Sequence, residues 1–321
     1  MSQRTTPPFR ADHVGSLLRP PSLLAARAAH AQGRIDDAQL RAAEDDAIRA
    51  VVAMQRDVGL RSATDGEFRR ASWHMDFIYQ LDGVTKAPGD LVVKFHNAEG
   101  DIEFTPAAMQ IDGRLGVSDT IFGKDFTFLR DVVDGGATPK LTIPSPSMVH
   151  YRGGRAAIDE DVYPELDAFW ADLTAAYAEE VRRLGDAGCT YLQFDDTSLA
   201  YLNDPEQRKH VVAIGGDGEH QHEAYIKHIN EALAARPAGM SVTTHMCRGN
   251  FRSSWVAEGG YDFVAEALFS ELAVDGFFLE YDDARSGSFA PLRFVPPGKV
   301  VVLGLVTTKR GQLESKEDLK R

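Results

Sequence analysis

Short β-branched runs alternate with longer amphipathic segments along most of this chain, and this alternation constrains the fold more than any other feature. Apolar residues recur with helical spacing in several segments, and β-branched or aromatic runs lie between them. The expected helices cover residues 37–59, 166–184, 220–235 and 261–273, and the expected strands cover residues 9–16, 60–67, 140–143, 190–196, 241–247, 276–280 and 299–306. Strands that alternate with helices in this way are typical of a parallel sheet with helical crossovers.

Residues 84–130 interrupt the alternation. They contain short alternating runs, such as residues 91–95 and 102–104, and predict a β-hairpin insertion after the second strand. We expect residues 1–321 to form one α/β domain, a (β/α)8 TIM-type barrel that carries this insertion. Seven strands are expected where such a barrel has eight. The predicted barrel is therefore incomplete at its C-terminal end, with the eighth strand missing from this chain.

Polar residues gather at the C-terminal ends of the expected strands. They are Ser16, Asp65, Glu67, Ser145, Asp195, Asp196, His245, Cys247, Glu280 and Lys309. Active sites of (β/α)8 barrels lie on this face and are built from the ends of several strands. We therefore expect the functional site there.

His245 and Cys247 are the most informative pair in this set. Residues i and i+2 of a strand point to the same face, so the imidazole and the thiol should project together. The next expected strand ends at Glu280. Nitrogen, sulfur and oxygen donors from neighbouring strand ends suit Zn²⁺, and a catalytic zinc keeps one position open. The alternative is a small core cysteine beside a core histidine with satisfied hydrogen bonds.

Composition narrows the classes of partner. The net charge of −13 argues against nucleic acid and against anionic membrane surfaces. Two cysteines provide no disulfide framework, which favours a reducing compartment. The first eight residues lack the apolar core of a signal peptide, and no apolar run reaches the ~18 residues that suggest a membrane span. We expect a cytoplasmic protein with small-molecule partners, and the sequence leaves its oligomeric state open.

Five segments carry a resemblance to a known family. They are residues 13–16 (His-Val-Gly-Ser), 65–70 (Asp-Gly-Glu-Phe-Arg-Arg), 193–196 (Gln-Phe-Asp-Asp), 244–247 (Thr-His-Met-Cys) and 278–280 (Phe-Leu-Glu). In order and spacing, the chain resembles the C-terminal catalytic barrel of cobalamin-independent methionine synthase, and above all the short single-barrel relatives of that enzyme. The resemblance covers nearly the whole chain.

The resemblance implies a zinc ion held by a histidine, a cysteine, a glutamate and a second cysteine. His245, Cys247 and Glu280 match the first three ligands. No cysteine follows Cys247, so the fourth ligand is missing together with the eighth strand that would carry it. Cys189 precedes its strand and lies at the opposite end from Asp195, so it does not replace that ligand.

The implied reaction is methyl transfer from the N5 of a methylated folate to a thiol such as homocysteine, giving methionine. An amine leaving group must be protonated as it departs. In the family, a histidine of an Asp-x-His sequence after the seventh strand is the presumed acid. This chain has Val306-Thr-Thr-Lys309 there, so either Lys309 is the proton donor or the proton comes from elsewhere.

The same resemblance assigns the substrate contacts. Asp195 and Glu67 match the residues that bind the amino group of homocysteine, and Ser16 matches a contact to its carboxylate. Trp73 is a candidate stacking wall for the pterin of the donor. Three of these residues have a structural alternative: a cap on the next helix for Asp195, a surface ion pair with Arg69 or Arg70 for Glu67, and a core position for Trp73.

Four further alternatives stay open at this point. Asp196 is either a site residue or a helix cap, and His13 is either a site residue or a structural histidine. The zinc site also suits a related thiol alkyltransferase with another donor or acceptor, such as an epoxide:thiol transferase. A catalytically inactive barrel that binds a metabolite would explain the missing fourth ligand.

Overall fold

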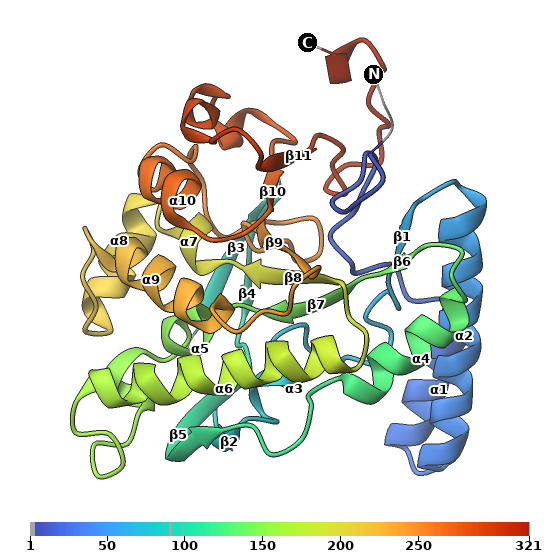
Figure 1. The fold of residues 1–321 in the computed structure, drawn as a ribbon, viewed down its shortest axis with the longest axis horizontal. Coiled ribbons are helices and arrows are strands. Elements are labelled where there is room, and N and C mark those ends of the chain that lie inside the picture. The colour runs from blue at the N-terminus through green and yellow to red at the C-terminus, as the bar shows by residue number, and fades with distance from the viewer. Residues whose placement is uncertain (1–3, 90–91, 98, 321) are drawn as a thin grey trace.

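A curved parallel sheet forms the centre of the molecule. The computed structural model describes residues 4–89, 92–97 and 99–320. Five parallel strands lie in the order β11-β10-β9-β8-β7, and a second parallel pair joins β1 to β6 (Figure 1). The strands are β1 (Ser62–Ala63), β6 (Thr138–Pro139), β7 (Leu141–Pro144), β8 (Tyr191–Asp196), β9 (Ser241–Met246), β10 (Gly276–Glu280) and β11 (Val300–Gly304). Only Lys140 separates β6 from β7, so this segment connects the β1–β6 pair to the five-stranded sheet.

Helices connect these strands. The longer ones are α1 (Pro21–Ala31), α2 (Asp37–Asp57), α4 (Gly123–Val133), α6 (Leu166–Asp186), α8 (Pro205–Ala213), α9 (Gln221–Leu233) and α10 (Ala265–Glu271). Short ones follow strand ends: α3 (Met75–Ile78), α5 (Ser147–Tyr151), α7 (Ser198–Tyr201), and the 3-10 turns η1 (Gly154–Ala157), η2 (Ala284–Ser286), η3 (Ala290–Phe294) and η4 (Asp318–Lys320). The helices expected at 37–59, 166–184 and 220–235 are confirmed, whereas the one at 261–273 shortens to α10.

Local sequence explains where α2 begins. The Asp36 side chain accepts a hydrogen bond from the Gln39 backbone, and the Gln39 side chain accepts one from the Asp36 backbone. This reciprocal capping box satisfies two backbone donors at the start of the helix. The apolar stripe of α2 then packs with β1 and α4 in a small core that includes Ile48, Val52 and Leu129. A larger core fills the space between the central sheet and α6, α9 and α10.

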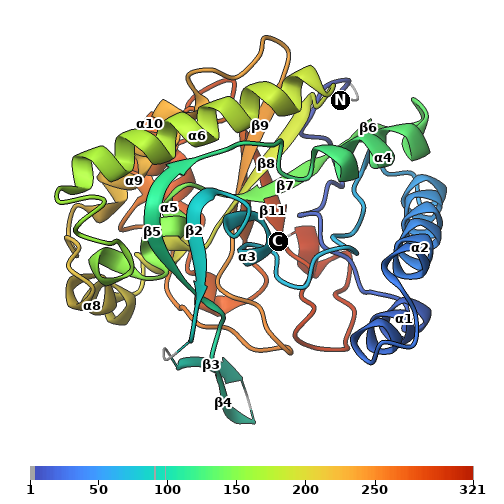
Figure 2. The ribbon, with the colours of Figure 1, turned by 90° about the horizontal axis from the view of Figure 1, so that it is seen from below.

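Two antiparallel pairs lie in the segment where the hairpin insertion is expected. β2 (Asp82–Ala87) pairs with β5 (Ala108–Gly116), and β3 (Val93–Asn97) pairs with β4 (Gly100–Phe104). Figure 2 shows the β3–β4 pair extending from the body of the molecule. The antiparallel strands end at Gly116, and α4 occupies most of the remaining residues up to 130.

The strand expected at residues 9–16 is wrong. The segment is held by side chains instead: Gln193 Nε2 donates to Val14 O at 2.8 Å, and Thr64 Oγ1 donates to Gly15 O at 2.6 Å. Gly15 has a φ of 115°, a conformation that interrupts a regular strand. The strand expected at 60–67 likewise shrinks to β1, because the chain turns at Gly66 and Glu67, which both have positive φ.

Strand pairing among the described residues runs from β1 to β11 without closing into a ring. The closed (β/α)8 barrel and the missing eighth strand therefore stay predictions. No helix in the described part of the chain is both long enough and apolar enough to span a membrane.

Candidate active site at the strand ends

His245 and Cys247 lie at the C-terminal end of β9, between two neighbouring strands. His245 is paired with Asp195 of β8 on one side and with Phe278 of β10 on the other. Glu280 follows Phe278 by two positions and therefore faces the same side of the sheet. The parallel register thus brings the imidazole, the thiol and the carboxylate to one edge.

The environment of the Cys247 thiol favours its neutral form. Burial raises the pKa of this thiol, and the carboxylates of Glu280 and Asp195 raise it further. The backbone N–H of Gly249 donates to Sγ at 3.3 Å and acts in the opposite direction. The other cysteine, Cys189, is buried and its pKa is raised to about 12, which makes it inert.

Glu280 is held by cations. Its Oε1 lies 2.9 Å from Lys309 Nζ and 3.3 Å from Arg285 Nη2, and its Oε2 accepts a hydrogen bond from the Arg248 backbone at 3.3 Å. Lys309 Nζ also lies 2.8 Å from Asp282 Oδ2. Burial would lower the pKa of the Lys309 ammonium, but the carboxylates of Glu280 and Asp282 outweigh it and raise that pKa.

The donor set fits zinc in kind and in strand position. With its proton on Nδ1, His245 donates to Asp195 Oδ1 at 3.2 Å and presents Nε2, an arrangement common for histidine ligands of metals. However, no three His, Cys, Asp or Glu side chains within residues 4–89, 92–97 and 99–320 stand close enough together to hold a metal ion.

Glu67 lies in a buried polar cluster on the neighbouring strand ends. Its Oε1 accepts a hydrogen bond from Thr142 Oγ1 at 2.8 Å and lies 3.3 Å from Arg70 Nη1. The expected alternative, an ion pair with Arg70, therefore exists, but it is buried and not at the surface. Burial raises the pKa of Glu67 and Asp195 adds to the rise, while Arg70 opposes it. The backbone of Glu67 has a φ of 59°.

Asp195 and Asp196 differ in their bonding although they are adjacent. Asp195 Oδ1 accepts hydrogen bonds from Gln193 Nε2 and His245, and within the described chain Oδ2 carries none. Asp196 caps the following turn through Leu199 N at 2.8 Å. It also accepts hydrogen bonds from the hydroxyls of Ser145, Ser147 and Ser198. Asp196 is thus the helix cap, and Asp195 has an oxygen available for a ligand.

The other predicted residues have diverse surroundings. Ser16 is exposed, and the next residue, Leu17, donates its backbone N–H to Gly66 O at 3.1 Å, so Ser16 lies beside the Glu67 turn. The Trp73 ring packs on the His74 ring with centroids 4.4 Å apart, and its role in donor binding stays a prediction. His13 accepts from Gly15 N and bonds Gln55, so its structural reading is supported.

Sequence reasoning missed several residues that contact the predicted ones. Arg285 pairs with Glu280, Asp282 pairs with Lys309, and Thr142 donates a hydrogen bond to Glu67. Asp282 and Arg285 follow the end of β10 directly, so the strand-end rule that found Glu280 also applies to them. Thr142 carried no such signal, because it lies inside a strand that reads as wholly buried.

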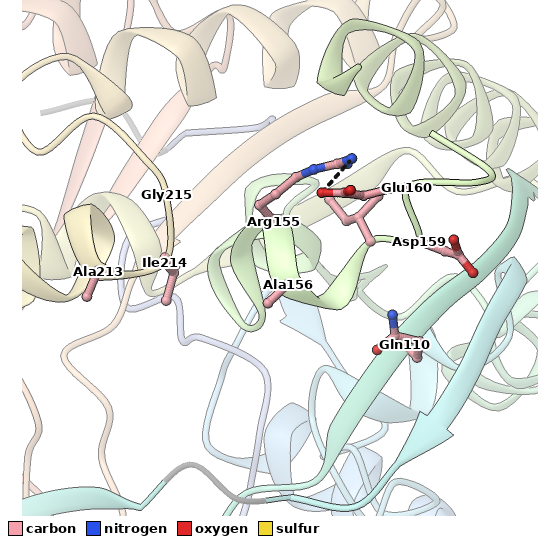
Figure 3. Close-up of a pocket in the computed structure, with 9 residues that line it drawn as sticks. Gln110, Arg155, Ala156, Asp159, Glu160, Ala213, Ile214 and Gly215 are labelled. Carbon is pink, nitrogen blue, oxygen red and sulfur yellow. Dashed lines mark ion pairs between the residues drawn. The ribbon is translucent and has the colours of Figure 1, made fainter. Parts of the chain in front are cut away.

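A surface cavity of about 580 Å³ lies away from these strand ends. It is lined by residues of β5, η1 and the turn after α8, among them Gln110, Asp159 and Ile214 (Figure 3). Two of its charged side chains, Arg155 and Glu160, pair with each other at 3.6 Å. None of the predicted site residues lines it, so we place the candidate site at the strand ends and not in this cavity.

Comparison with curated proteins identifies relatives that match over most of their length. The chain is 44% identical to the uncharacterized protein YxjG of Bacillus subtilis over 99% of its own length and 83% of that protein. It is 45% identical to the uncharacterized protein YxjH of the same organism, covering 98% of this chain and 81% of that one. A protein of Pyrococcus abyssi named methionine synthase is 23% identical over 96% of this chain and 78% of its own length.

Solved structures give the same relationship. A structure from Listeria monocytogenes, described as a candidate vitamin-B12-independent methionine synthase, has a TM-score of 0.77 and 39% identity, covering 99% of this chain and 86% of that one. A B12-independent methionine synthase from Shewanella, solved with selenomethionine, has a TM-score of 0.66 at 20% identity over 89% of this chain and 76% of that one, and shows likeness of fold alone.

A family model described as the catalytic domain of cobalamin-independent synthase matches residues 9–321. The match spans nearly the whole chain and includes every strand end discussed above. The α/β fold is accordingly similar to the barrel structures of methionine synthases. The chain belongs to the family of cobalamin-independent synthase catalytic domains.

Proposed function

We propose that this chain is a zinc-dependent methyltransferase that moves the methyl group of a methylated folate, of the 5-methyltetrahydrofolate type, to homocysteine, giving methionine. Membership of the family supports methyl transfer, and a relative bears the name methionine synthase. The observation that carries the proposal is the grouping of His245, Cys247 and Glu280 at adjoining strand ends beside Asp195.

In this proposal His245, Cys247 and Glu280 hold the zinc. Bound zinc supplies one piece of chemistry, which is to keep a coordinated thiol deprotonated at neutral pH, so that the acceptor is a thiolate. Asp195 and Glu67 bind the ammonium group of homocysteine, and the available Oδ2 of Asp195 supports this role. Ser16 contacts the substrate carboxylate, and Trp73 stacks on the methyl donor.

Lys309 is our candidate proton donor to the departing amine of the folate. It is the ammonium group nearest to Glu280, at 2.9 Å. Its raised pKa makes it a weak acid while both carboxylates are ionised, so its position supports the role more than its acidity does.

The test is zinc content and methyl transfer in the 321-residue protein. We expect about one zinc per chain and methionine formation from homocysteine and 5-methyltetrahydrofolate, supplied with one or three glutamates. Cys247→Ala should lose both, whereas Cys189→Ala, folded to the same extent by circular dichroism, should keep the zinc. Undiminished zinc and activity in Cys247→Ala would contradict the proposal.

A second candidate is an inactive barrel that binds a metabolite. It is favoured by the pairing of Glu280 with two cations. Homocysteine binding without zinc and without methyl transfer from any folate would favour this candidate. An alkyltransferase with another donor, such as an epoxide, would instead bind zinc and leave methylated folate unreacted.

A further inference from the structure

Lys309 bridges two carboxylates at the end of β10. Its Nζ lies 2.9 Å from Glu280 Oε1 and 2.8 Å from Asp282 Oδ2. Arg285 Nη2 approaches the same two side chains, at 3.3 Å from Glu280 Oε1 and 3.2 Å from Asp282 Oδ1. The side chains of Lys309 and Asp282 are 8% and 4% exposed, so solvent screens this network only weakly.

Glu280 and Asp282 are both paired with cations without a metal ion. Lys309 and Arg285 each contact both carboxylates, and Arg285 also pairs with a third carboxylate, Asp283, at 2.8 Å. The charge of Lys309 is divided between Glu280 and Asp282. Glu280 alone belongs both to this network and to the predicted zinc ligands. A divalent cation bound to Glu280 would lie within a few ångströms of the Lys309 ammonium, and like charges at that distance repel strongly where solvent is excluded.

We propose that Lys309 is an exchangeable counter-ion of the metal site. In the metal-free chain it neutralises Glu280, and when a metal ion takes that carboxylate it keeps only its contact with Asp282. Asp282 is therefore the carboxylate that retains the lysine during the exchange. This inference rests on the proposed function, since it takes Glu280 to be a metal ligand.

Two properties of the network support exchange over a fixed structural pair. Asp282 Oδ2 is already 2.8 Å from Nζ, so Lys309 need not find a new partner when it leaves Glu280. Arg285 also stays in place, because Asp282 and Asp283 hold it at 3.2 Å and 2.8 Å independently of Glu280. The exchange then costs one ion pair and leaves no buried cation unpaired.

The test is the zinc dissociation constant of the full 321-residue chain, measured by competition with a chromophoric chelator. Lys309→Met keeps the length of the side chain and removes its charge, and we expect the Kd for zinc to fall about tenfold (about 1.4 kcal/mol). Lys316→Met removes the same charge from an exposed position nearby and should leave the Kd unchanged. Metal-free circular dichroism checks that each variant is folded.

Asp282→Asn should change the Kd for zinc in the opposite direction. Without the second carboxylate, Lys309 is held by Glu280 alone, so the Kd for zinc should rise. A merely structural network predicts weaker zinc binding in both variants. An unchanged or higher Kd in Lys309→Met would overturn the counter-ion role, and an unchanged or lower Kd in Asp282→Asn would overturn the role of Asp282.

The outcomes separate this inference from the proposed function. If wild type binds zinc through Cys247 and Lys309→Met does not bind it more tightly, the inference fails and the function stands. If wild type binds no zinc but Lys309→Met does, the inference is supported in its strongest form. If neither chain binds zinc, the zinc site and the counter-ion role fail together.

Discussion

Two lysine–carboxylate clusters lie along β10 and differ in how their charge is shared. Lys140 lies over the ring of Phe278 at 4.0 Å and pairs with Asp12 at 3.6 Å, with both side chains wholly buried. Lys309 pairs with Glu280, two positions further along the same strand. In the Lys140 cluster a single carboxylate collects several donors, whereas in the Lys309 cluster a single ammonium is divided between two carboxylates.

The Lys140 cluster holds the N-terminal segment in place. Asp12 accepts hydrogen bonds from Ser62 Oγ and Tyr191 OH, each at 2.7 Å, and Lys140 donates to His13 O at 2.5 Å. These contacts hold the N-terminal segment against the sheet where no strand ladder exists. The second arrangement allows a partner to change, because a lysine with two carboxylates can lose one of them and remain paired.

The largest expected effect comes from Lys140→Met. It leaves the Asp12 carboxylate buried without its cation, so we expect the free energy of unfolding to fall by about 3–5 kcal/mol. Urea denaturation followed by circular dichroism measures this, with Lys124→Met at an exposed position as the control. A loss below about 1 kcal/mol would show that the Lys140 cluster is not the structural one.

The pH dependence of stability sharpens the same contrast. Burial lowers the pKa of Lys140 to about 8 from 10.5, although Asp12 and Asp195 oppose the shift. Between these two values the unfolded chain binds more protons than the folded chain, so the free energy of unfolding should rise with pH in that window. Lys140→Met should lack this rise when unfolding is measured from pH 7.5 to 10.5, and parallel curves for both chains would contradict the assignment.

Asp195→Asn tests the strand-end site and leaves the direct ion pairs of both clusters in place, although it removes a carboxylate whose charge acts on Lys140. It removes the negative charge offered to the substrate ammonium, and we expect KM for homocysteine to rise about 10- to 100-fold. Asp196→Asn is the matched control, because within the described chain the Asp196 carboxylate already accepts hydrogen bonds from Ser145, Ser147, Ser198 and Leu199. Asp196→Asn should lower the free energy of unfolding and leave KM unchanged. A raised KM in Asp196→Asn together with an unchanged KM in Asp195→Asn would mean that Asp196, and not Asp195, binds the substrate.

The smallest expected effect is that of Lys309→Met on the metal-free chain. Arg285 remains on both carboxylates, so the free energy of unfolding should fall by only about 1 kcal/mol. Urea denaturation in the presence of a chelator measures this value. A loss as large as that of Lys140→Met would mean that the two clusters have the same structural role.

The sequence predicted the helices and strands that have a regular spacing of apolar residues. The helices α2, α6 and α9 and the strands β8 to β11 follow from hydrophobic spacing. The segment 9–16 could not be predicted, because its position depends on side chains from distant strands, such as Gln193 and Thr64. Closure of the barrel stays a prediction, since it depends on pairing between the first and last strands, which the strand pairing of the described residues does not include.

The candidate site shows a similar division. The rule that strand ends converge brought Asp195, His245 and Glu280 together, and the register confirms that Asp195 and His245 are paired. The same rule did not reveal that Glu280 is occupied by Lys309 and Arg285, because pairing among several charged residues depends on their rotamers in the folded chain. Nor did it distinguish the role of Asp196, whose carboxylate caps the next turn through Leu199 N and also accepts hydrogen bonds from Ser145 and Ser147.

The order of residues along the chain also fixes the order in which Glu280 and Lys309 are synthesised. Lys309 follows Glu280 by 29 positions, so at about 5–20 residues per second the ribosome adds the lysine some seconds after the carboxylate. His245, Cys247 and Glu280 are all synthesised before the ammonium that neutralises Glu280. On the proposed assignment, all three metal ligands therefore precede their competitor in the order of synthesis.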